Sequence, residues 1–82
     1  MRYRIEFTED AKKQLRALPP NVRRDIGYKL FLMEEDLTGD VKKLKGFKHE
    51  YRLRVGNYRV IFELQGEAIT VYAIGDRKDI YS

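Results

Sequence analysis

The sequence predicts an α+β fold in which two N-terminal helices pack on one face of a small, mainly antiparallel four-stranded sheet, in the order β-α-α-β-β-β. Three observations predict it: alternating polar and apolar residues at the start, helical spacing of apolar residues over 22–37, and strand-like segments joined by glycine turns after position 49. With 82 residues, we expect a single domain spanning 1–82.

The N-terminal part of the chain reads as a strand followed by a short helix. Residues 2–7 alternate apolar and charged side chains, which is typical of a half-buried strand. Thr8 is a good N-cap, so we expect a first helix over about 9–18. Pro19 and Pro20 end it, because the first proline disfavours a helical conformation at the preceding residue.

A second helix is predicted from Pro20 or Asn21 to about Asp36. Its apolar residues recur at spacings of three and four, which gives one stripe for the core: Val22, Ile26, Leu30, Met33 and Leu37. Tyr28, Phe31 and Leu32 lie off this stripe. We therefore expect contacts on a second side of the helix, either with the first helix or with a partner protein.

The rest of the chain reads as a basic loop up to Gly46 and then three strands, over about 50–55, 58–64 and 68–75. Gly56-Asn57 fits a two-residue type II′ turn, which takes glycine first, and residues 65–67 supply the second reversal.

The first turn fixes the register of the hairpin. It pairs Val55 with Tyr58 and Arg54 with Arg59, and it places Arg52 opposite Ile61. The parity of the strands then assigns one apolar face to the core: Tyr51, Leu53, Val55, Tyr58, Val60, Phe62, Leu64, Ile69, Val71 and Ala73. The other face holds the three arginines together with Tyr72 and Ile74.

Composition excludes several classes of site. The chain has no cysteine, which rules out disulfides, thiolate nucleophiles and cysteine metal sites. The chain has one histidine, His49, so a ribonuclease with two catalytic histidines is excluded. The acidic residues are scattered along the sequence, so no metal site is predicted. No apolar run approaches the length of roughly 18 residues that spans a membrane. We expect a cytoplasmic protein with no membrane contact and no small-molecule cofactor.

Positive charge is concentrated in one window. Of the formal net charge of +4, residues 42–59 carry +6, because seven basic residues stand against Glu50 alone, and the remainder carries −2. Such a concentration predicts a polyanionic partner, most commonly nucleic acid. The lysines of the predicted RNA-binding set are Lys42, Lys43, Lys45 and Lys48; alternatively, they are solvated surface.

The arginines of the hairpin predict an anion site. Directly opposed like charges destabilise a sheet by some tenths of a kcal/mol, so packing gives no reason to place Arg54 against Arg59. Guanidinium groups donate in a planar fork that suits phosphate. Tyr72 on the same face could stack on an RNA base. The alternative is a face that carries arginines for solubility and a tyrosine that only covers the sheet.

The stretches KKLKGFKHEYRLRVGNYRVIFEL and AITVYAIGDRKDIY resemble RelE-like toxins of toxin–antitoxin pairs, within the RelE/ParE superfamily. The resemblance covers nearly the whole chain. It implies a ribosome-dependent endoribonuclease that cleaves mRNA and is silenced by a cognate antitoxin. It also implies catalytic roles for Arg52, Arg54, Arg59, Arg77 and Tyr81, and RNA contact for Lys45.

The chain departs from these relatives in ways that bear on mechanism. Arginines replace the lysines of the best-known ribonucleases at positions 52 and 54, and an arginine with a pKa above about 12 stabilises charge but cannot act as a base. Asp76 stands where many relatives carry histidine. Tyr81 is the candidate base for attack by the RNA 2′-hydroxyl, or else an apolar cap on the sheet. The alternatives to the nuclease are a ParE-like poison of DNA gyrase and a non-catalytic module that binds RNA or an antitoxin.

Overall fold

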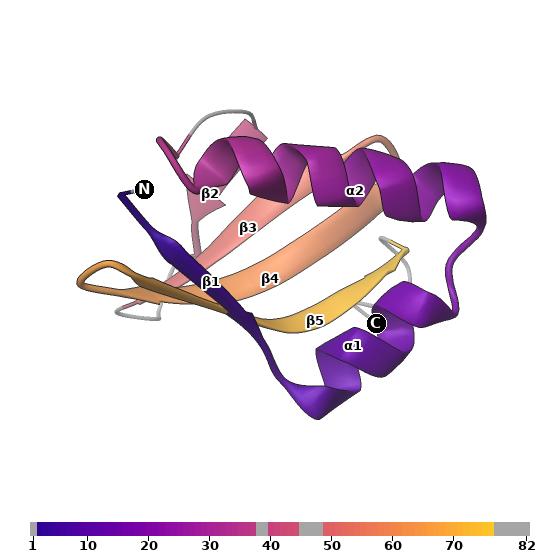
Figure 1. Ribbon diagram of the computed structural model, residues 1–82, viewed down its shortest axis with the longest axis horizontal. Helices are drawn as coiled ribbons and strands as arrows, with labels where there is room; N and C mark the ends of the chain where they lie inside the picture. The colour runs from indigo at the N-terminus through magenta and orange to yellow at the C-terminus, as the bar shows by residue number, and fades with distance from the viewer. Residues whose placement is uncertain (1, 38–39, 45–48, 77–82) are drawn as a thin grey trace.

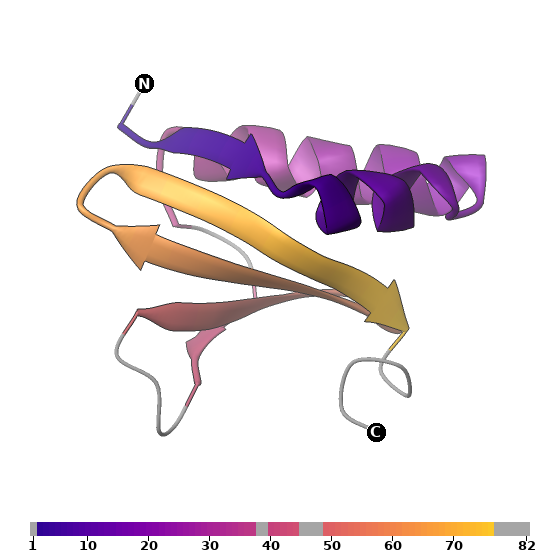
Figure 2. The same ribbon diagram turned by 90° about the horizontal axis from the view of Figure 1, so that it is seen from below.

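The computed structural model describes residues 2–37, 40–44 and 49–76, and in these ranges two helices lie on one face of a five-stranded sheet (Figure 1). The N-terminal strand β1 (Arg4–Phe7) leads into α1 (Glu9–Arg16) and α2 (Pro20–Met33). Four strands follow: β2 (Asp40–Lys43), β3 (Glu50–Val55), β4 (Tyr58–Gln65) and β5 (Ala68–Asp76). The α+β prediction is confirmed, and Figure 2 shows both helices on the same side of the sheet.

The sheet has the order β1-β5-β4-β3-β2. Only the β1–β5 pair is parallel among these strands, with Arg4 opposite Ala68 and Phe7 opposite Val71, so the first strand closes the sheet against the last. The Gly56-Asn57 turn is the one predicted, whereas the second reversal is one residue shorter than predicted, because Gln65 belongs to β4. Gly56 and Gly66 begin the two turns with φ values of 61° and 60°, which a side chain would disfavour.

Both helices begin where the sequence predicted. The Thr8 hydroxyl accepts a hydrogen bond from the Ala11 N–H at 3.2 Å, as an N-cap does, and α2 begins at Pro20. Both helices end earlier than predicted, at Arg16 and Met33, because the following residues form only single turns.

The core lies between the helices and the sheet. The predicted stripe of α2 faces the strands, with Ile26, Leu30 and Met33 buried. The sheet contributes buried residues from its three longest strands: Leu53, Val60, Phe62, Ile69, Val71 and Ile74. Tyr51 and Phe62, which are opposite each other on β3 and β4, stack with ring centroids 5.6 Å apart.

The prediction of four strands was wrong, because residues 40–43 form the edge strand β2 rather than part of a basic loop. In this four-residue strand only Val41 is apolar, so the alternating pattern is too short to recognise. Pairing with β3 creates the strand, and exposed lysines are common on such edges.

The prediction for the end of β5 was also wrong. A register irregularity between Ile61 and Phe62 places Ile74 opposite Val60, in the core, and Ala73 opposite Ile61, on the other face. The Gln14 side chain of α1 accepts a hydrogen bond from the Ile74 N–H at 2.6 Å, beside this irregularity. A β-bulge adds one residue to a strand, so the residues after it face the opposite side from the one that simple alternation predicts. No pattern in the sequence predicted the bulge at this place.

Candidate functional site

The candidate site is the sheet face opposite the helices, which we call the outer face (Figure 2). Strand register arranges its residues in three rows across the strands. The basic row contains Asp40, Arg54, Arg59 and Gly75; the middle row contains Lys42, Arg52, Ile61 and Ala73; the acidic row contains Glu50, Glu63 and Thr70. Charge therefore changes sign along the length of the strands.

The basic row opposes two arginines, as predicted. Arg54 is the register partner of Arg59, one residue from the turn, where opposed Cα atoms in a non-hydrogen-bonded pair are about 4.5 Å apart. Arg54 is exposed, but Arg59 is only 6% exposed. Its Nη1 donates to the carbonyl oxygens of Gly56 at 3.3 Å and Tyr58 at 3.2 Å. The turn thus holds a buried guanidinium beside Arg54.

The middle row joins the basic row to an apolar centre. Arg52, half-buried, lies opposite Ile61 on β4 and opposite Lys42 on β2. Residues two apart on a strand are separated by roughly 7 Å, so Arg52 and Arg54 are close enough for both guanidinium groups to reach one phosphate. Ile61 is only 6% exposed although it faces away from the helices.

The acidic row is chemically different. Glu50 and Glu63 oppose each other, and the Tyr72 hydroxyl donates a hydrogen bond to Glu50. Burial, that hydrogen bond and the negative charges of both glutamates raise the pKa of Tyr72 well above its usual value of about 10. Tyr72 therefore remains a protonated donor at neutral pH and cannot serve as a base.

The structure brings together part of the predicted site. Arg52, Arg54, Arg59 and Lys42 meet on the outer face, whereas Lys43 is exposed on β2 opposite Tyr51, on the other parity. Tyr72 shares the face but belongs to its acidic end. The predicted residues Lys45, Lys48, Arg77 and Tyr81 lie outside the described residues.

Sequence reasoning missed two features of this face. The backbone of Asp40 joins the basic row opposite Arg54, which could not be foreseen without β2. The link between Tyr72 and Glu50 was also missed, although the predicted register already placed Glu50 opposite Glu63 at the far end from Arg59.

The fold and the matched sequence define the class of protein. A family model described as ParE toxin of type II toxin–antitoxin system, parDE, matches residues 5–81. The chain therefore belongs to the RelE/ParE superfamily of toxins from type II toxin–antitoxin systems.

Individual relatives lie on the RelE side of this superfamily. The chain is 36% identical over 85 residues to Toxin RelE3 of Methanocaldococcus jannaschii, covering 95% of this chain and 94% of that protein. It is 31% identical over 88 residues to the mRNA interferase toxin RelE of Escherichia coli K12, covering 100% and 93%. The solved RelB–RelE antitoxin–toxin complex from Methanococcus jannaschii matches with a TM-score of 0.82 and 32% identity, covering 93% and 94%.

Proposed function

We propose that this chain is a ribosome-dependent mRNA endoribonuclease, the toxin of a toxin–antitoxin pair, that inhibits translation by cleaving mRNA. The Escherichia coli relative with 31% identity is named an mRNA interferase. The observation that carries the proposal is the gathering of Arg52, Arg54 and Arg59 in two adjacent rows of the outer face.

In the proposed reaction the RNA provides its own nucleophile. The 2′-hydroxyl attacks the adjacent phosphorus, the bond to the 5′-oxygen breaks, and the products carry a 2′,3′-cyclic phosphate and a 5′-hydroxyl. This chemistry uses neither a metal nor an added water. The crowded phosphorane intermediate gains negative charge, and fixed positive groups stabilise that charge most when they are held in place beforehand. Arg59 is held in this way by its turn.

The three arginines have related roles in this proposal. Arg52 and Arg54 stabilise the charge of the phosphate, and Arg59 acts with Arg77 on the developing phosphorane. Because arginine does not give up its proton, none of them is the base. Tyr72 is excluded as the base by its raised pKa.

Tyr81 is the proposed base that takes the proton of the 2′-hydroxyl. Arg77 assists the departing 5′-oxygen by its charge, and this oxygen takes a proton from solvent to become the 5′-hydroxyl. A phenol is a weak base at neutral pH, since only about 0.1% of it is ionised at a pKa near 10. Most of the rate must then come from the ribosome, which holds the mRNA in line for attack; such positioning can supply several kcal/mol. We expect slow cleavage of free RNA.

Binding follows from the same face. We propose that Lys42, Lys43, Lys45 and Lys48 contact the RNA backbone, and that Tyr72 stacks on a base as a neutral phenol. The ribosome and its mRNA are then the targets, in the cytoplasm. A cognate antitoxin is the proposed inhibitor, because a related toxin was solved in complex with RelB.

Ribosomes programmed with a defined mRNA test the proposal. Toeprinting should reveal cleavage by the native chain, and the downstream fragments should need phosphorylation before ligation, because they carry a 5′-hydroxyl. Tyr81→Phe should weaken cleavage strongly. If expression of the chain stops growth but the mRNA on ribosomes stays intact, the nuclease proposal is contradicted.

The second candidate function is poisoning of DNA gyrase. The matching family model is described as a ParE toxin, which favours it. Gyrase with supercoiled plasmid should then accumulate cleaved DNA when the chain is added, while mRNA on ribosomes stays intact. A third reading, a non-catalytic module that binds RNA or an antitoxin, predicts neither product.

A further inference from the structure

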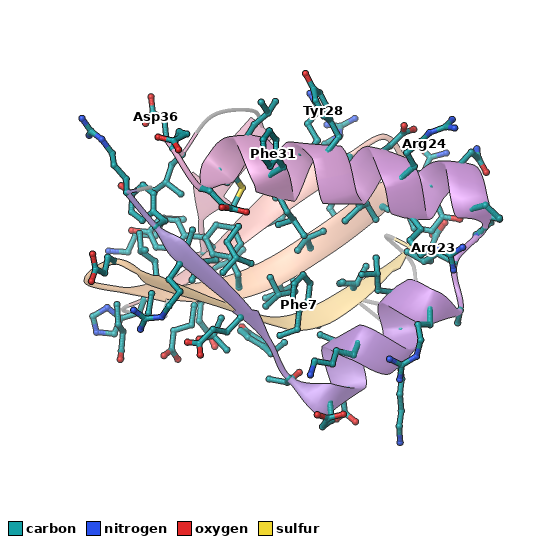
Figure 3. The ribbon with its side chains drawn as sticks, viewed as in Figure 1. Phe7, Arg23, Arg24, Tyr28, Phe31 and Asp36 are labelled. Atoms are coloured by element: carbon teal, nitrogen blue, oxygen red, sulfur yellow. The ribbon has the colours of Figure 1, made fainter. Side chains whose placement is uncertain are left out.

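Two large aromatic side chains of α2 are turned away from the core. Tyr28 is 60% exposed and Phe31 is 64% exposed, and they are the exposed large hydrophobic residues of the described part of the chain. Figure 3 shows both on the side of α2 that does not face the sheet. The fold leaves them uncovered, because α1 packs mainly against β5. Together the two rings form an apolar patch on the surface of α2 that is available for contact.

The aromatic pair is part of a longer line on the helix. Arg24, Tyr28, Phe31 and Glu35 are spaced by four, three and four residues, so they share one face, opposite the buried stripe. We call these four residues the α2 line. The helical path reaches its last member, because the Glu35 N–H donates to the Leu32 carbonyl oxygen at 3.3 Å. Arg24 and Glu35 are both exposed.

The α2 line is complementary to a second α2 line that runs in the opposite direction. From the midpoint, one aromatic residue lies on each side, with a positive charge beyond one and a negative charge beyond the other. A two-fold axis through that midpoint would bring each charge to the opposite charge of a second molecule. A contact of this kind, the same patch on both subunits, is how symmetric dimers form.

We propose that the α2 line is the contact surface for a second copy of this chain, with the two α2 helices antiparallel. Arg24 of each copy pairs with Glu35 of the other, and Tyr28 of each copy packs at the level of Phe31 of the other. At a rise of 1.5 Å per residue, each charge lies about 8 Å along the helix from the two-fold axis. A shallow crossing angle of about 20° keeps both ion pairs within reach.

The signs of the charges favour a copy over other occupants. Nucleic acid would be repelled by Glu35 and by the neighbouring Glu34 and Asp36. A uniformly acidic surface would meet the same repulsion, and a uniformly basic one would be repelled by Arg24. The outer face lies on the opposite side of the sheet from α2, so this dimer does not cover it. The inference therefore does not depend on the proposed function.

One pair of helices makes a small interface. Stable specific complexes bury at least about 1,200 Å² in total, and two short helical faces bury less. We expect a weak dimer, with a dissociation constant on the order of 100 μM. Sedimentation velocity over a concentration series that extends above this value measures it directly.

Charge reversal gives a test specific to the antiparallel arrangement. Arg24→Glu alone places two like-charge pairs in the dimer, and so does Glu35→Arg alone; each should weaken self-association at least about tenfold. An equimolar mixture of the two variants restores both opposite-charge pairs. It should therefore associate within about threefold of the native protein, because the same number of opposite-charge pairs forms.

Lys29→Glu is the matched control, since it makes the same charge change at an exposed position of α2 away from the line. It should associate like the native chain, and far-ultraviolet circular dichroism should be the same for all variants. A native chain that stays monomeric at the highest concentration, or a mixture that associates no better than its components, would overturn the proposal. Equal weakening by Lys29→Glu would also overturn it.

Discussion

Each end of the outer face holds a pair of like charges, and the two pairs are hydrogen-bonded by different groups. At each end a like-charge pair stands directly across two strands, Arg54 with Arg59 and Glu50 with Glu63. At the basic end, backbone carbonyls of the turn accept from the buried guanidinium. At the acidic end, the Tyr72 phenol donates to a carboxylate. A neutral group of the protein therefore hydrogen-bonds one member of the like-charge pair at each end. Under the proposed function, the phosphate binds at the basic end.

The largest expected effect is at the basic end. Under the nuclease proposal, Arg59→Ala should lower mRNA cleavage on ribosomes by about 100-fold or more, as loss of one preorganised charge stabiliser does. Glu63→Ala at the acidic end should stay within about threefold of native activity, because it removes no stabiliser of the phosphorane.

Because Arg59 also binds its own turn, urea unfolding must accompany the assay. Arg59→Ala that remains folded at the assay temperature and still cleaves at the native rate would contradict the role given to the basic row. Loss of cleavage equally in Glu63→Ala would remove the distinction between the two ends.

An intermediate effect is expected at Tyr72. Tyr72→Phe removes the donor to Glu50, and we expect it to lower the free energy of unfolding by about 1 kcal/mol at neutral pH. Tyr28→Phe, which removes an exposed hydroxyl, is the matched control and should change stability little. Urea denaturation of both variants measures the difference.

The same variant has a signature at high pH. The pKa of Tyr72 is raised in the folded chain, so above about pH 10 the unfolded chain loses that proton first, and stability falls as pH rises. The stabilising contribution is present below that pH. Tyr72→Phe should flatten the decline above pH 10, whereas Tyr28→Phe should decline as steeply as the native chain. Identical slopes in native and Tyr72→Phe proteins would contradict the assignment.

The smallest expected effect concerns the acidic pair. Glu63→Gln keeps the shape of the side chain and removes the charge opposite Glu50, so we expect it to stabilise the fold by a few tenths of a kcal/mol. The gain should shrink as salt is added, because salt screens the repulsion in the native chain. A gain that is independent of salt would show that repulsion is not its cause.

Particular residues show how far the sequence predicts this site. Gly56-Asn57 fixed the pairing of Arg54 with Arg59 and of Arg52 with Ile61, because a two-residue turn leaves one register. Ile74 and Ala73 were assigned to the wrong faces, since strand parity alone does not predict the register irregularity beside Ile61.

The sequence also did not predict in which direction the long side chains of the outer face extend. Sequence parity places Arg59 on the outer face, but it does not show that its guanidinium turns back to the carbonyls of its own turn. Tyr72 likewise had the right parity, while its bond to Glu50 depends on how β5 passes β4. The register of the β3–β4 hairpin was readable from the sequence, and the side-chain partners were not.

The parallel pairing of β1 with β5 has a consequence for biosynthesis. Residues 4–7 are synthesised well before their register partners, residues 68–71. Contacts between such distant segments form late, because a long loop must close before they yield any stabilisation. A nascent chain therefore leaves the exit tunnel with β1 unpaired, and the sheet is completed only after residues 68–71 have also emerged.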